Sequence, residues 1–313
     1  MSLPRERHPG TTYLVTRRCE RREMRLRPCD AMNAAFAVAL ADGCERHGCQ
    51  LVAVCVMSNH HHMVVHDPAG RISDLLRDLH ATVARFGNAA HGVPGQAFWD
   101  GQQCDAVELG DADTVVEAVA YCLANPVRAG LVARPEEWPG LRTRVADIGT
   151  GHGPIFARPS EFFRADGRVS EAVQVWTEAP PMVVAAYGLE GFKRRVQARL
   201  DAIVAAEQRA VATAGRTFMG SAAVLAQSVW ATPQAPEQRA VGADAKPRRT
   251  VAARTKARLL ALIERVQRFR VLHRRAIEAF AQGFHQTVFP AGTWQAWRHY
   301  GAVRSPGLRL AAA

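Results

Sequence analysis

Residues 50–67 read QLVAVCVMSNHHHMVVHD, and the prediction of the fold starts from this stretch. Its two runs, QLVAVCVM and HHHMVVHD, are rich in the apolar and β-branched residues that favour strands. Ser58 and Asn59 separate the two runs, and such a pair is typical of a tight turn. The stretch therefore predicts two β-strands joined by a turn, and the second strand begins with three histidines.

The segment before this strand pair predicts one strand and one helix. YLVTRR at residues 13–18 has the β-branched and aromatic content of a strand. In residues 30–48, the side chains of Met32, Phe36 and Leu40 recur at helical spacing and lie on one face. Asp30, two residues after Pro28, is expected to cap the start of this helix.

The segment after the strand pair also alternates between helices and strands. Its patterns predict a helix over residues 72–92, a strand over 102–109 and a helix over 111–126 that Asp111 or Asp113 caps and Pro126 ends. The order of strand, helix, two strands, helix, strand and helix is typical of a ferredoxin-like α+β unit with an antiparallel sheet. We expect this unit to end near residue 145 and a mostly helical C-terminal region to follow it.

Composition narrows the class of protein. The chain has 313 residues and a formal net charge of +11, which favours a polyanionic partner such as nucleic acid. It has no apolar run long enough to span a membrane and no secretory signal at its start, so a cytoplasmic, nucleoid-associated protein is expected. The seven cysteines are never spaced as C-x-x-C, which indicates reduced thiols.

The histidines that begin the second strand form a candidate metal site. Side chains two residues apart on a strand point to the same face, so His60 and His62 can converge on one metal ion while His61 points away. Imidazole is a good ligand for several divalent metals. Taken alone, three consecutive histidines also fit a partly exposed strand edge.

A tyrosine and an asparagine share one face of the helix predicted over 111–126. Tyr121 and Asn125 are four residues apart, so the phenol and the carboxamide project together. A helical tyrosine in the core and an Asn-Pro helix end are the plainer interpretation of the same residues.

The two motifs together, VMSNHHHMVV and YCLANPVRAGLV, resemble the REP-associated tyrosine transposases, a group of HUH transposases that use a single tyrosine. The phrases YLVTRR, FWDGQQC and EEWPGLRT add to this resemblance, which spans roughly residues 10–145. Two positions depart from the pattern of the group. The middle residue of the histidine motif, His61, is usually apolar or aromatic there, and Gln102 stands where arginine is common.

The resemblance implies the HUH fold, a role for each motif residue and a substrate. By position, His60, His62 and Asn125 match metal ligands for Mg²⁺ or Mn²⁺, and Tyr121 matches the nucleophile. The implied function is metal-dependent cleavage and rejoining of single-stranded or hairpin DNA, such as palindromic repeats, through a 5′-phosphotyrosine intermediate. A domesticated DNA-binding protein without this activity is the alternative, and a histidine-rich hydrolase of small phosphoesters is a third hypothesis. We expect a monomer, with a dimer as the alternative.

Two groups of basic residues are expected to contact DNA, although solvated basic faces would have the same composition. The first group lies at the end of the first strand and just after it: Arg17, Arg18, Arg21 and Arg22. The second begins the C-terminal region: Arg248, Arg249, Arg254, Lys256 and Arg258. Arg128, two residues beyond the predicted end of the tyrosine helix, is expected to contact DNA as well. Contacts of this kind increase the affinity for DNA, and this affinity decreases as the salt concentration rises. They contribute little to the choice of DNA sequence.

Residue patterns also divide the chain into expected units. Residues 1–148 form the expected catalytic domain, 149–230 a helical extension, 231–250 a flexible linker, 251–303 a basic helical region and 304–313 a disordered tail.

Overall fold

The computed structural model describes residues 4–102, 104–233 and 249–305. Its main sheet has five strands in the order β2-β3-β1-β4-β7. Their bounds are β1 Thr11–Arg18, β2 Gln50–Val56, β3 His60–Asp67, β4 Asp105–Leu109 and β7 Val251–Ala252. The first four strands pair antiparallel, whereas β7 pairs with β4 in parallel.

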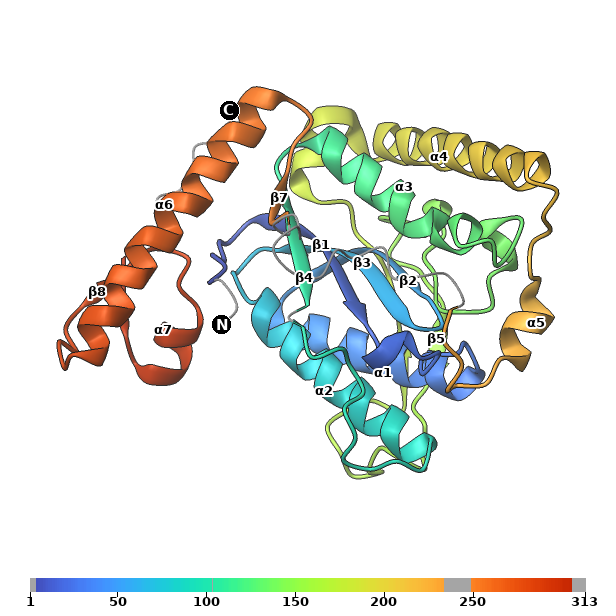
Figure 1. The fold of residues 1–313 in the computed structure, drawn as a ribbon, viewed down its shortest axis with the longest axis horizontal. Helices are drawn as coiled ribbons and strands as arrows, with labels where there is room; N and C mark the ends of the chain where they lie inside the picture. The colour runs from blue at the N-terminus through green and yellow to red at the C-terminus, as the bar shows by residue number, and fades with distance from the viewer. Residues whose placement is uncertain (1–3, 103, 234–248, 306–313) are drawn as a thin grey trace.

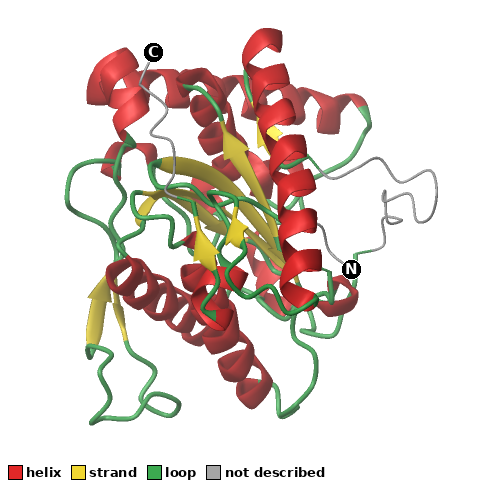
Figure 2. Ribbon diagram, turned by 90° about the vertical axis from the view of Figure 1, so that its left-hand side faces the viewer, coloured by secondary structure: helices red, strands yellow, loops and turns green. Residues whose placement is uncertain are grey.

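Helices cover both faces of the sheet (Figures 1 and 2). On one face lie α1 (Asp30–His47) and α2 (Ile72–Ala90), which bury Phe36, Leu40 and Leu79 against the strands. On the other face lies α3 (Ala112–Arg128), which packs against α4 (Pro181–Thr213). The apolar core is thus divided by the sheet into two layers, and α3 belongs to the second.

Both edges of the sheet are covered by chain that lies far away in sequence. The amide of Val56 at the end of β2 donates to the carbonyl of Leu141 at 2.9 Å, and Thr143 donates to Val54 at 2.9 Å. At the other edge, β7 pairs with Glu108 and Leu109 of β4. Unpaired edge groups are a common site of unwanted association, and both edges are protected here.

The rest of the chain adds short elements and one long helix. They are η1 Glu20–Arg22, η2 Pro135–Glu137, η3 Val145–Asp147, β5 Ile155–Ala157, β6 Ala172–Gln174, α5 Ser221–Ala226, α6 Lys256–Ala281, β8 Val288–Phe289, α7 Gln295–Tyr300 and β9 Val303–Arg304. The β5–β6 hairpin was not predicted from the sequence. Arg265 of α6 bonds the carboxylates of Glu6 and Glu108, so α6 is fastened to the sheet by a partly buried ion-pair cluster.

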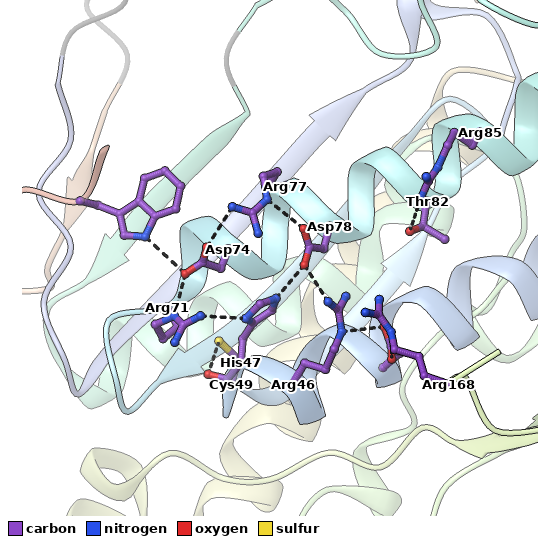
Figure 3. Close-up of polar contacts among 12 residues, drawn as sticks. Arg46, His47, Cys49, Arg71, Asp74, Arg77, Asp78, Thr82, Arg85 and Arg168 are labelled. Carbon is purple, nitrogen blue, oxygen red and sulfur yellow. Dashed lines mark hydrogen bonds and ion pairs between the residues drawn. The ribbon is translucent and has the colours of Figure 1, made fainter. Parts of the chain in front are cut away.

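A polar network joins the C-terminal end of α1 to α2 (Figure 3). Asp78 accepts hydrogen bonds from Arg46 and His47 of α1 and from Arg77 beside it. Burial opposes the charge on Asp78. The hydrogen bonds from Arg77 and His47, with the positive charge of Arg77, outweigh burial and lower the pKa of Asp78 to about 2.

The predicted strands and helices of residues 11–128 are confirmed, with two corrections at helix ends. The side chain of Asp30 does not cap α1, because Cys29 occupies the capping position and makes no side-chain bond there. Pro126 does not end α3, which continues to Arg128. The Asp111 side chain does cap α3, accepting from the amide of Thr114 at 2.8 Å.

Most of the expected linker and of the expected tail lies outside the described residues. Residues 234–248 of the expected linker and 306–313 of the expected tail are not described, whereas Arg304 forms part of β9. Within the described ranges, no helix has the length and apolar character needed to cross a bilayer.

Candidate functional site

The candidate site lies where β3 begins beside the end of β1. In the antiparallel register, His60 is opposite Arg18 and His62 is opposite Thr16. The two imidazole rings project from the same face, with their centroids 4.8 Å apart. Strand geometry thus places two nitrogen donors side by side, as the spacing of the histidines predicted.

Each of these imidazoles is oriented by a bond to its Nδ1 atom. His60 Nδ1 lies 2.6 Å from the carboxamide oxygen of Asn59, which only accepts, so this nitrogen carries the proton. His62 Nδ1 lies 2.8 Å from the hydroxyl of Thr16. In the tautomer where Thr16 accepts, both Nε2 atoms keep their lone pairs. This arrangement, with the second ring nitrogen held by a partner, is common for histidines that bind metals.

The tyrosine helix packs directly on the histidine strand. The ring of Tyr121 stands edge-on to that of His62, with centroids 5.3 Å apart. The neighbouring thiol of Cys122 donates to the carbonyl of His62 at 3.4 Å, which fixes α3 against β3 at this point. Residues that are 59 positions apart in sequence, His62 and Tyr121, are therefore in contact within one chain.

Asn125 lies one turn beyond Tyr121, and its side chain is held by the helix backbone. Its Nδ2 donates to the carbonyl of Tyr121 at 2.8 Å and lies 3.5 Å from that of Cys122. Pro126 has no amide to offer Cys122, so the side chain of Asn125 partly replaces the missing donor. Because both bonds use Nδ2, the Oδ1 atom is left available as an oxygen ligand.

The chemistry of these donors fits a divalent metal. Burial, followed by the charges of Arg18 and Arg22, lowers the pKa of His60 to about 3. Burial, followed by the neighbouring His60 and other cations, holds the pKa of His62 well below its usual value. Both imidazoles are therefore neutral at pH 7, the form that binds metal. Among the described residues no cluster of three His, Cys, Asp or Glu side chains could hold a metal ion. A third protein ligand beside the two histidines would therefore be of another type, and the amide oxygen of Asn125 could serve as one.

Arginines surround the candidate ligands. The charges of Arg18 and Arg22 act on His60, and those of Arg18 and Arg128 act on His62. The guanidinium of Arg128 lies 4.6 Å from the centre of the Tyr121 ring and 3.7 Å from the carboxylate of Glu207 on α4. A site with this positive field is suited to phosphate groups.

The loop that carries Arg21 and Arg22 has an unusual backbone. Their φ angles are 51° and 61°, in the left-handed region that residues other than glycine seldom adopt. The carbonyl of Arg22 accepts a bond of 3.1 Å from the side chain of Asn59, so the residue that orients His60 also holds this loop. Strained segments of this kind often lie at functional sites.

Other predicted residues take structural positions. His61 faces the opposite side of the sheet, fully buried, where its Nε2 lies 2.9 Å from that of His80. The guanidinium of Arg17 lies over the ring of Trp99, at 5.6 Å from its centre. Arg17 is thus part of the packing under the sheet rather than of the histidine face.

The basic residues of the C-terminal region do not join the site. The amide of Arg254 bonds the Asp111 carboxylate at 2.6 Å, and Arg258 donates to the carbonyl of Gly110. Asp111 caps the start of α3, ten residues before Tyr121, which corresponds to about 15 Å along the helix. Arg249 and Lys256 are exposed, and Arg248 lies outside the described residues.

Three residues that contact the candidate site residues were not among the predicted site residues. Thr16 and Asn59 each bond an imidazole, and Glu207 contacts Arg128. Asn59 could have been found from its place beside His60. Thr16 and Glu207 have no local signal, because only strand pairing and helix packing bring them to the site.

Comparisons with known proteins found distant structural resemblance only. The sequence matches no family model and no curated protein. One similar solved structure is a REP-associated tyrosine transposase bound to a REP hairpin, with 19% identity, 47% of this chain and 84% of that chain covered, and a TM-score of 0.40. Another is a candidate transposase from Deinococcus radiodurans, with 22% identity, coverage of 34% and 85%, and a TM-score of 0.27. Both are too distant to assign a family or an activity to this chain.

Proposed function

We propose that this protein is a metal-dependent DNA strand transferase that cleaves and rejoins single-stranded or hairpin DNA through a 5′-phosphotyrosine at Tyr121. The observation that carries the proposal is the contact between the rings of Tyr121 and His62, 5.3 Å apart. It places a potential nucleophile beside a pair of metal-ligand candidates, with Asn125 one turn away. The motif resemblance noted in the sequence supplies the reaction class, and we extend it to this chain as a hypothesis.

His60 and His62, through Nε2, and Asn125, through Oδ1, would hold the metal. Two nitrogens and one oxygen leave positions for phosphate oxygens and water, as suits Mg²⁺ or Mn²⁺. A bound divalent ion would polarise the scissile phosphate and offset the charge that develops on it. The protein's own contribution is to keep the imidazoles neutral and to aim them through Asn59 and Thr16.

Tyr121 supplies the nucleophilic oxygen. Its phenol oxygen attacks phosphorus, the bond to the 3′ oxygen breaks, and the phenol proton passes through solvent to that leaving oxygen. The products are a 5′-phosphotyrosine and a free 3′-hydroxyl. Because the new bond is also a phosphodiester, attack by another 3′-hydroxyl regenerates the phenol and rejoins DNA without an external energy source.

The arginines around the site would bind the substrate. Arg18, Arg22 and Arg128 lie close enough for their charges to act on the candidate ligands. Guanidinium groups suit phosphate oxygens, and Arg128 lies over the Tyr121 ring, beside the phosphate that this residue would attack. The distant group, including Arg254, Lys256 and Arg258, would contact phosphates farther along the DNA and contribute affinity rather than chemistry.

The direct test is a denaturing gel of the full chain with end-labelled hairpin DNA and Mn²⁺. We expect a labelled, protease-sensitive adduct that disappears with a chelator and in Tyr121→Phe. Tyr300→Phe is the matched control, because Tyr300 is 66% exposed and would be the preferred site of adventitious reaction. An adduct that survives Tyr121→Phe would refute the proposed nucleophile. DNA binding without any adduct would favour a DNA-binding protein that lacks strand-transfer activity.

A further inference from the structure

Trp230 is a large aromatic side chain exposed on the surface, in the segment that follows α5. The residue is 42% exposed, although tryptophan is usually well buried in folded proteins. The guanidinium of Arg25 lies over its ring, 5.0 Å from the centre, and the ring of His91 lies 6.0 Å away at a steep angle. The Arg25 cation thus supports one face of the ring, while much of the Trp230 surface stays exposed to solvent.

The support beneath Trp230 is fixed. Arg25 is only 4% exposed, pairs with Glu23 at 2.6 Å and donates to the carbonyl of Ala97 at 2.8 Å. Arg25 is thus a buried part of the scaffold. It therefore holds the indole ring in place from below, through a cation–π contact.

The segment that carries Trp230 is joined to the loop beside the histidines. The carbonyl of Ala231 accepts from the amide of Met24 at 3.0 Å, and the carbonyl of Gln227 accepts from Arg27 at 2.9 Å. Met24 follows the left-handed residues Arg21 and Arg22 by two positions. Trp230 thus braces the same strained loop whose carbonyl holds Asn59, the partner of His60.

The loop of residues 20–27 connects the candidate site, where the charge of Arg22 acts on His60, to the support of Trp230, and it carries more arginines than acids. Arg25, which supports the indole, follows Arg22 by three residues, at most about 11 Å of extended chain. Arg21 is exposed on this loop, and the acidic side chain of Glu23 is already paired with Arg25. A rigid exposed aromatic ring beside a basic path is the arrangement with which proteins bind unpaired nucleic-acid strands.

We propose that Trp230 is a stacking platform for an unpaired nucleobase of the DNA strand whose phosphate lies at His60 and His62. This inference rests on the proposed function and deepens it, because it makes a single-stranded flank, rather than the duplex stem, the part of the substrate that is bound next to the cleaved position. Stacking accepts any base, so the platform would add affinity for unpaired strands with little choice of sequence.

The test measures binding separately from chemistry. In a Tyr121→Phe background, fluorescence anisotropy at fixed salt gives Kd for a hairpin with and without a single-stranded flank. We expect Trp230→Ala to raise Kd for the flanked hairpin roughly 5- to 100-fold and to leave the blunt hairpin unchanged. Trp230→Phe, which keeps an aromatic face, should recover most of the affinity.

Trp176 provides the matched control. It is 50% exposed and follows β6, and nearby Glu178 bonds the start of β2 at Leu51, at the opposite end of that strand from the candidate site. Trp176→Ala should leave both values of Kd unchanged. Equal weakening of flanked and blunt hairpins by Trp230→Ala, or no weakening, would overturn the platform.

A second measurement leaves Trp230 unchanged and so does not depend on the folding of a Trp230 variant. Photocrosslinking of DNA carrying 5-iododeoxyuridine in the flank should label the peptide that contains Trp230, and a crosslink confined to other peptides would contradict the proposal. If the adduct forms but Trp230→Ala leaves the Kd for the flanked hairpin unchanged, only the proposal for Trp230 fails. If flank binding needs Trp230 but no adduct forms, only the proposed chemistry fails, and an absence of all DNA binding would overturn both.

Discussion

Replacing Thr16 with valine should weaken metal binding without removing any candidate ligand. The change keeps the shape of the side chain but removes the hydroxyl that lies 2.8 Å from His62 Nδ1. His62 is only 5% exposed, so water cannot readily replace this partner. Loss of such an orienting bond typically lowers metal affinity about 10- to 100-fold, which corresponds to about 1.4–2.7 kcal/mol.

Thr12→Val is the internal control for this prediction. Thr12 lies on the same strand and makes the same kind of bond, 3.1 Å, to His66 Nδ1. Both variants should lose about 1–3 kcal/mol of folding stability, because each leaves a buried imidazole nitrogen without its partner. Only Thr16→Val should raise the Kd for Mn²⁺, since His66 lies four residues, about 13 Å, beyond His62.

The measurement is calorimetric titration of Mn²⁺ into the two variants and the unaltered protein, with urea unfolding of each. Equal Mn²⁺ affinity in Thr16→Val and Thr12→Val would refute the reasoning that Thr16 orients a ligand. A tenfold or greater loss confined to Thr16→Val would support His62 as a ligand independently of any DNA substrate.

Three further predictions concern the third ligand, the α1–α2 network and the attachment of α6. Asn125→Ala should abolish the DNA adduct in the gel assay, whereas Asn125→Asp, which keeps an oxygen ligand, should retain it; retention in both would exclude Asn125 as a ligand. Because the pKa of Asp78 is lowered to about 2, its contribution to stability is complete above its ordinary pKa near 4 and is lost as the pH falls toward 2. Urea unfolding should show this loss in the unaltered protein and a flatter pH profile in Asp78→Asn. Arg265→Met should cost about 2–4 kcal/mol, because the buried carboxylate of Glu108 loses this partner while Glu6 keeps His8; adding Glu108→Gln should restore part of the loss, as chemical denaturation can measure.

Local periodicity was enough to predict most elements of residues 11–128. The alternation of β3 and the helical spacing of α1 and α2 are strong short-range signals, because one face of each element is buried in the core. The same spacing placed His60 beside His62 and Tyr121 beside Asn125. The edge-on contact between Tyr121 and His62 depends on the packing of α3 against β3, which no local pattern specifies. Only the motif resemblance predicted that the two residues lie together.

The misplaced helix end at Pro126 has a physical reason. Proline removes the amide that would bond the carbonyl of Cys122, and this usually stops a helix. Here the side chain of Asn125 lies against the same turn and donates to the carbonyl of Tyr121, so α3 continues for two more residues. That continuation carries Arg128 to its position over the Tyr121 ring.

Long-range features were beyond the reach of sequence patterns. The strand β7 is two residues long and pairs with a strand more than a hundred positions earlier, so nothing in its neighbourhood distinguishes it from a loop. The same holds for Trp230, because its proposed role depends on contacts with Arg25 and His91, which are distant in sequence. Both arise from the tertiary arrangement alone.

The strand β7 is translated long after its partner β4, so the edge of β4 stays unpaired during much of protein synthesis. Leu109 of β4 pairs with Ala252 of β7, and these residues are 143 positions apart (252 − 109). At about 5–20 residues per second, roughly 7–30 s separate the translation of the two partners. From the translation of Val132 until that of β7, the nascent chain carries β4 as an open edge although every residue of the histidine and tyrosine motifs has been made. A ribosome that stalls within residues 129–250 would therefore release a chain with all of the candidate ligands and an unprotected sheet.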